Sequence, residues 1–228
     1  MAVTVDMKAL FEAGAHFGHK TSRWHPKMSQ YIHSKKGDTH IINLDKTVAN
    51  LDKALAFTTD LAKNGKKVLF VGTKKQLKDL VKESAEAVEM PYVTVRWVGG
   101  TLTNVETVNR QIRKLKDLEK KMASGELESR YSKLEVQRFQ EEIDLLNERY
   151  GGIKEMSEQP ATVLVTDAVE DKNAIKEAKT LHIPIIAICD TNVDPTGIDY
   201  VIPMNDDAIK AEKLVLDYFV ETIKSAKK

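Results

Sequence analysis

Stretches of almost wholly apolar residues stand at intervals along this chain, each followed by a segment with helical periodicity. They are KVLFVG (67–72), ATVLVTD (161–167) and PIIAICD (184–190). Strands without polar alternation are typical of a parallel sheet that is buried on both faces. Because helices alternate with these strands, the pattern predicts an α/β fold, a three-layer α/β/α arrangement around a doubly wound parallel sheet.

Weaker signals extend this pattern. Shorter runs read as further strands, namely HIINL (40–44), YVTVRW (92–97) and YVIP (200–203). Apolar residues at helical spacing predict helices that cover roughly residues 45–64, 77–88, 172–181 and 206–224.

One segment, residues 104–150, breaks the alternation. Apolar residues recur every three or four positions over 105–122 and again over 136–150, and no strand lies between these stretches. Ser132 and Glu135 form a capping box that begins the second helix. Two helices of about 20 residues would each be roughly 30 Å long. We therefore expect an inserted antiparallel coiled-coil hairpin that projects from the sheet.

The charges are unevenly distributed, although the formal net charge is only +1. Residues 1–37 hold six Lys/Arg against two acids, whereas from residue 150 onward nine lysines face fourteen acids. Such a chain can bind a polyanion with one face. Its single cysteine, Cys189, lies in an apolar strand, which indicates a buried thiol and a reducing cytoplasm. No apolar run approaches the ~20 residues of a membrane span, so we expect no membrane partner.

Doubly wound sheets often carry enzyme sites. VLFVGTKK places Lys74 and Lys75 at a strand end ahead of a helix, where a phosphate group binds readily. The glycine motifs of nucleotide pockets are missing, so a phosphate contact remains possible but nucleotide hydrolysis does not. Asp167 and Asp190 end two strands and could hold Mg²⁺ in a metal-dependent phosphotransfer enzyme. The alternative is that these aspartates cap the helix or turn that follows.

Two other groups of residues are candidate metal ligands. His16 and His19 are one helical turn apart, but no third zinc ligand is evident nearby, and both can instead pack in an irregular segment. Asp190, Asp206 and Asp207 could share a structural divalent ion, zinc or magnesium, with a histidine. No other cofactor is expected.

A nucleic-acid partner accounts for more of the sequence. AHFGHKTSRWHPKM (15–28) gathers cations, imidazoles and an indole without an acid. Lys and Arg neutralise phosphates, while Trp and His offer flat faces for stacking on bases. RWVGGTLTN (96–104) repeats this chemistry, with glycines that allow close backbone approach. Its Trp97 either stacks or continues the preceding strand into the core. A scaffold that binds only protein through the hairpin is a third possibility.

Several motifs in chain order resemble one family. They are AHFGHKTSRWHPKM, HIINLDKT, VLFVGTKK, RWVGGTLTN, GGIK and CDTNVDP…YVIPMNDDAI. Together they are similar to the bacterial ribosomal protein S2 family of the small subunit, over almost the whole chain. Many members continue in an acidic tail, whereas this sequence stops at SAKK.

The resemblance implies a flavodoxin-like domain, formed by residues 1–103 with an N-terminal RNA-binding extension and by residues 151–228, and a coiled-coil hairpin at 104–150. It also implies a non-enzymatic, cytoplasmic protein of the ribosome, without a small-molecule substrate. Such a protein lies between head and body, contacts small-subunit ribosomal RNA and neighbouring proteins, and provides a docking platform for ribosomal protein S1. By motif, the expected RNA contacts are His19, Lys20, Arg23, Trp24, Lys27, Lys74, Lys75, Arg96, Thr103 and Asn104. The divalent ion of some members makes Asp190, Asp206 and Asp207 the expected metal ligands.

Overall fold

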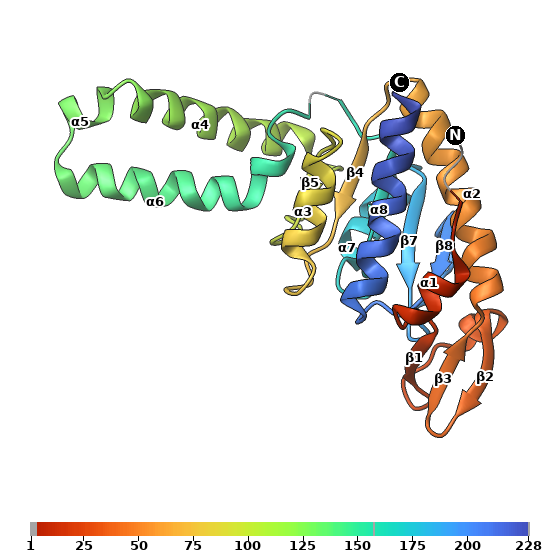
Figure 1. Ribbon diagram of the computed structural model, residues 1–228. Coiled ribbons are helices and arrows are strands. Elements are labelled where there is room, and N and C mark those ends of the chain that lie inside the picture. The colour runs from red at the N-terminus through yellow and green to blue at the C-terminus, as the bar shows by residue number, and fades with distance from the viewer. Residues whose placement is uncertain (1–3, 157, 228) are drawn as a thin grey trace.

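A parallel sheet of five strands forms the centre of the protein (Figure 1). The computed structural model describes residues 4–156 and 158–227. The strands lie in the order β5-β4-β6-β7-β8, which in their own chain order is the 2-1-3-4-5 arrangement of flavodoxin-like sheets. The predicted parallel sheet is confirmed. Its strands are β4 (Val68–Val71), β5 (Tyr92–Val93), β6 (Thr162–Val165), β7 (Ile185–Cys189) and β8 (Tyr200–Pro203).

Helices cover both faces of this sheet, because alternate strand residues point to opposite sides. Val68 and Phe70 of β4 pack into one core with α2 (Leu44–Lys63), α3 (Lys78–Glu86) and α8 (Ile209–Ala226). Leu69 and Val71 pack into a second core with α7 (Lys172–Thr180) and residues of the 105–150 segment. The result is three layers, as the alternation of strands and helices predicts.

The segment between β5 and β6 contains α4 (Val105–Ala123), a short α5 (Glu126–Arg130) and α6 (Lys133–Tyr150). Figure 1 shows α4 and α6 side by side and extending away from the sheet, and we call this part the helical hairpin. The capping box at the start of α6 is present. That the hairpin packs as a coiled coil stays a prediction. No helix in the described ranges is long and apolar enough to cross a membrane.

Two strand predictions need correction. HIINL contributes only to β3 (Thr39–Ile42), which belongs to a separate antiparallel sheet of order β1-β3-β2 rather than to the central one. YVTVRW forms only the two-residue strand β5, since its partner β4 ends at Val71, opposite Val93, and the pairing ends there. The other elements of the N-terminal region are α1 (Met7–Glu12), β1 (Phe17–Lys20), a 3-10 turn η1 (Pro26–Tyr31) and β2 (Ile32–Lys36). A second 3-10 turn, η2 (Gly151–Ile153), follows α6.

Candidate nucleic-acid interface

The segment 15–28 lies against the carboxyl ends of β7 and β8. The backbone N–H of His19 donates to the Thr191 hydroxyl at 2.9 Å, and that of His25 donates to the Thr191 carbonyl at 2.7 Å. Gly18 makes this approach possible, because a Cβ there would lie 2.6 Å from the methyl group of Thr191. The segment therefore lies at the carboxyl ends of the parallel strands, which is where open α/β folds bind their ligands.

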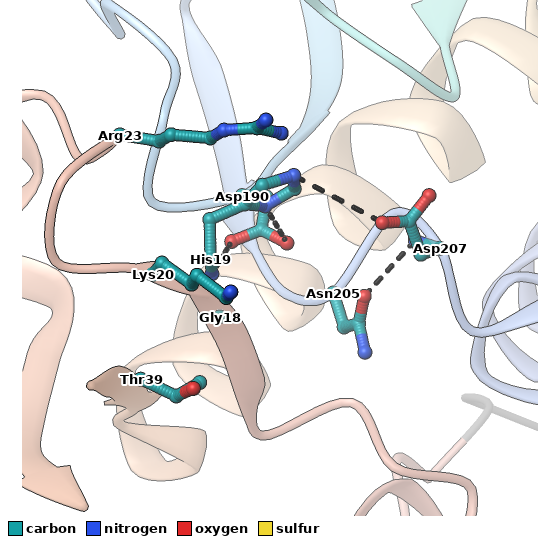
Figure 2. A pocket seen from close by; sticks show the side chains of 8 residues that line it. All are labelled: Gly18, His19, Lys20, Arg23, Thr39, Asp190, Asn205 and Asp207. Carbon is teal, nitrogen blue, oxygen red and sulfur yellow. Dashed lines mark hydrogen bonds and ion pairs between the residues drawn. The ribbon is translucent and has the colours of Figure 1, made fainter. Parts of the chain in front are cut away.

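A pocket of 390 Å³ opens between this segment and the strand ends (Figure 2). Lys20 and Arg23 line it from the N-terminal segment, and Asp190, Asn205 and Asp207 line it from the loops that follow β7 and β8. Both cations are exposed, and neither forms an ion pair within the described part of the chain. Two unneutralised cations beside an open pocket are suited to bind phosphate groups.

His19 also lines the pocket, and both of its ring nitrogens lie near carboxylates of the protein. Its Nδ1 lies 2.9 Å from Asp190 Oδ2, and its Nε2 lies 3.9 Å from Asp207 Oδ2 (Figure 2). The hydrogen bond to Asp190 raises the pKa of His19 above its usual value, although burial opposes this shift. The imidazole is thus oriented by a buried carboxylate, an arrangement more typical of a fixed ion pair or metal ligand than of a stacking ring.

Trp24 and Lys27 are both exposed, but each already has a neighbour. The Trp24 ring packs against His40 with a centroid separation of 5.1 Å, and the residue remains 37% exposed. The Lys27 ammonium lies 3.0 Å from Asp194 Oδ2 and donates to the Thr196 hydroxyl at 2.6 Å. Trp24 therefore keeps surface for stacking, whereas an anion would have to compete with Asp194 for Lys27.

Lys74, which follows β4 and is predicted to contact a phosphate, is surrounded by carboxylates of the protein itself. The Lys74 ammonium lies 3.2 Å from Asp167, 3.0 Å from Asp206 and 2.7 Å from Asp207. Burial would lower the pKa of Lys74, but the bonds to Asp207 and Asp206 outweigh burial and raise it. Burial and neighbouring carboxylates raise the pKa of Asp206 to about 7. Lys75, in contrast, is exposed.

The two aspartates of the phosphotransfer alternative have structural partners. Asp167 Oδ1 accepts hydrogen bonds from the backbone N–H groups of Val169 at 2.8 Å and Glu170 at 3.0 Å, as a capping residue does. Asp190 holds His19 and accepts from the Thr191 hydroxyl at 3.0 Å. These contacts give the enzymatic alternative no support.

The loop 96–104 is organised around a residue that sequence reasoning missed, Glu177 on α7. One carboxylate oxygen accepts from the Trp97 indole N–H at 2.9 Å and the Gly100 N–H at 2.8 Å. The other accepts from the N–H groups of Leu102 at 3.0 Å and Thr103 at 3.2 Å, and from the Thr103 hydroxyl at 3.1 Å. Burial would raise the pKa of Glu177, but these hydrogen bonds outweigh burial and lower it.

The predicted RNA contacts of this loop therefore differ in availability. Trp97 is buried in the core, so the open question of its role is answered in favour of packing. Thr103 already bonds Glu177, and Asn104 caps α4 by accepting from the Thr107 N–H at 3.4 Å. Arg96 is exposed and has no ion pair among the residues described. Across the described structure, no side-chain hydrogen bond joins this loop to the segment 15–28.

The structure brings a possible metal-binding group together beside the pocket. One ligand atom each from His19, Asp206 and Asp207 lie within 4.8 Å of one another. Asp190, also expected as a ligand, contacts the other ring nitrogen of His19, Nδ1, and so orients the ring. One imidazole and two carboxylates are a donor set that suits Zn²⁺, although Lys74 contacts both carboxylates.

Some residues near the candidate interface were not among the contacts predicted from the sequence. Lys35 and Lys36 are exposed on the edge strand β2, and Lys36 stands beside Thr39 of β3, the cross-strand neighbour of Lys20. Their adjacent charges are a sequence signal that could have indicated them. Glu177 has no comparable signal, because it lies on a helix about 75 residues from the loop that it holds.

Comparison with known families identifies the family of this chain. The family model described as "Ribosomal protein S2" matches residues 10–226 of the 228-residue chain. The match includes the pocket, the loop 96–104 and the helical hairpin. Members of this family have a structural role in the small ribosomal subunit. Because the match spans nearly the whole chain, the protein belongs to the ribosomal protein S2 family.

Proposed function

We propose that the protein binds small-subunit ribosomal RNA, between head and body of the subunit, through the cations at the carboxyl edge of its sheet. One observation carries this proposal: Lys20 and Arg23 are exposed, lack ion-pair partners within the described ranges, and flank an open pocket. Arg96 and Lys75 add exposed cations, and the partly exposed Trp24 adds a stacking surface. The protein works in cytoplasmic ribosomes as a structural component, without a small-molecule substrate.

Binding to small subunits that lack this protein tests the proposal. Removing one phosphate contact flattens the log–log salt dependence by about 0.7–0.9, so the double variant Lys20→Ala/Arg23→Ala should flatten the slope by roughly 1.5 units and weaken binding. The matched control is Lys53→Ala/Lys213→Ala, which removes two exposed lysines from the outer surfaces of α2 and α8. An unchanged slope in the first variant would contradict RNA binding by this edge.

We also propose that ribosomal protein S1 docks on the aromatic cluster beside α1. Phe11 and Phe17 are 56% and 46% exposed, and both pack against His16: the Phe11 ring stacks on it with centroids 4.2 Å apart, and the Phe17 ring lies tilted to it with centroids 4.1 Å apart. Exposed aromatic side chains that are already held in place suit a protein interface. Phe11→Ser/Phe17→Ser should lower S1 affinity at least about tenfold, whereas Tyr131→Ser at the hairpin end should not. The reverse pattern would place the docking site on the hairpin.

A structural divalent ion, zinc by preference, would be held by His19 Nε2, Asp206 and Asp207, with Asp190 as the partner of the second ring nitrogen. We expect one bound zinc per chain by elemental analysis after dialysis. His19→Gln should abolish this binding, whereas His33→Gln on β2 should not. Equal zinc content in the wild type and His19→Gln would refute the site.

A further inference from the structure

The Glu177 carboxylate is surrounded by donors that come from one loop. Within the described part of the chain, all the side-chain bonds that tie residues 97–104 to a distant element end on this carboxylate. Three backbone N–H groups, an indole and a hydroxyl form a cradle of the kind that proteins build for anions. Here the anion is part of the protein, so an RNA phosphate cannot enter the cradle. The conformation of the loop is therefore stabilised by a carboxylate of the protein, Glu177, and not by a bound ligand.

The same loop is the outgoing root of the helical hairpin. Leu102 is buried, Asn104 caps α4, and α4 begins at Val105. The returning root is held differently: Gly152 packs directly on Tyr92, where a Cβ would clash with the Tyr92 carbonyl and ring. The outgoing root is thus one of two places where the hairpin is held to the sheet, and a change there alters the direction in which the hairpin leaves the sheet.

We propose that Glu177 is a positioning residue: it sets the direction of the helical hairpin and, through Trp97, turns Arg96 outward. The statement on the hairpin is independent of any ligand. The statement on Arg96 rests on the proposed RNA-binding function, because Arg96 is the loop's exposed cation.

The charge and both oxygens of Glu177 are needed for this role. Gln has a single carbonyl oxygen, and its NH₂ group would face N–H donors, so Glu177→Gln leaves several donors of the root without an acceptor. A small change at the root is amplified at the tip. The 19-residue helix α4 is roughly 28 Å long, so a rotation of about 10° moves its far end by roughly 5 Å.

A distance measurement on the free, full-length protein tests the hairpin statement. Spin labels are attached at Ser129→Cys on α5 and Lys53→Cys on α2, both exposed positions. The native Cys189 is fully buried, and burial raises the pKa of its thiol, so it does not compete for the label. We expect Glu177→Gln to shift or broaden the distance distribution by about 5 Å, relative to unmodified Glu177 in the same labelled background.

Glu170→Gln is the matched control, because Glu170 is exposed just ahead of α7 and its side chain forms no hydrogen bond or ion pair with the residues described. Its distribution should equal that of the wild type. If Glu177→Gln does not fold, Trp97→Phe removes one donor and keeps the carboxylate, and it should give a smaller broadening. A wild-type distribution in every folded variant of this pair overturns the proposal.

Binding to subunits that lack the protein separates the two statements. Arg96→Ala and Glu177→Gln should each weaken binding, and the double variant should be no weaker than the more affected single variant, because both act through one contact. If the losses of affinity add up in the double variant, or if only Arg96→Ala weakens binding, Glu177 does not present Arg96. The proposal that the protein binds RNA is unaffected by either result. If Arg96→Ala and the Lys20/Arg23 variant both bind like the wild type, RNA binding fails and the Arg96 statement fails with it. The distance distribution still decides the hairpin statement.

Discussion

Replacing Lys74 with methionine should reveal that this lysine stabilises the fold. Its ammonium lies within 3.2 Å of three carboxylates, of which Asp167 and Asp206 are almost fully buried. Removing one partner of a buried ion pair costs about 3–5 kcal/mol, because the remaining charge loses its compensation. Asp207, which is largely exposed, contributes little to this cost. We therefore expect Lys74→Met to lower the free energy of unfolding by about 3 kcal/mol at about pH 8.

The pH dependence of this loss is the more specific prediction. Burial, Asp167 and Asp190 raise the pKa of Asp206 from 3.8 to about 7 even with Lys74 in place, and removing Lys74 raises the pKa further. A raised carboxyl pKa means that the folded state takes up a proton before the unfolded state does. The stability that the folded state gains from protonating Asp206 is complete below about pH 4, and it is lost as the pH rises through about 7. The loss in Lys74→Met should therefore shrink to about 1–2 kcal/mol at about pH 5.

Urea unfolding followed by circular dichroism at both pH values measures this difference. Lys75→Met is the matched control, because Lys75 is exposed, has no ion pair in the described structure and should change stability by less than about 0.5 kcal/mol. An equal loss for Lys74→Met at both pH values would refute the role of Asp206. An equal loss for Lys74→Met and Lys75→Met would refute the buried ion-pair cluster altogether.

Two further substitutions test the packing and the charge of the fold. Gly152→Ala should destabilise the protein by about 1–3 kcal/mol in thermal or urea unfolding, since the new methyl group would clash with the Tyr92 backbone. Gly151→Ala is the control and should not destabilise it, because a Cβ there would meet nothing closer than 3.4 Å. Equal losses of stability in the two variants would count against the contact between Gly152 and Tyr92. His19→Gln should destabilise more at about pH 5.5 than at about pH 8.5, because the bond to Asp190 raises the pKa of His19 and this stabilisation is lost as the pH rises through the folded-state pKa. A loss independent of pH would show that the ring is held by packing alone.

Local chemistry made much of the architecture predictable. The all-apolar residues of β4, β6 and β7 indicate a parallel sheet because only strands covered on both faces need no polar side. The capping box that begins α6 lies within four residues, so it can be recognised without the fold. The exposed cations Lys20 and Arg23 could likewise be named from an acid-free segment. Whether they contact RNA stays a prediction.

Tertiary structure alone decided which of the predicted contacts are still available. Lys74 looks like a phosphate ligand in the sequence VLFVGTKK, yet strand order places its ammonium beside Asp206, 132 residues away. Glu177 is an ordinary helix residue in the sequence, but it lies under the loop 96–104 because α7 packs on the same face of the sheet. Residue patterns report local periodicity and local hydrogen bonds. The partner of a charge, by contrast, depends on where a distant part of the chain returns, and only the fold determines that.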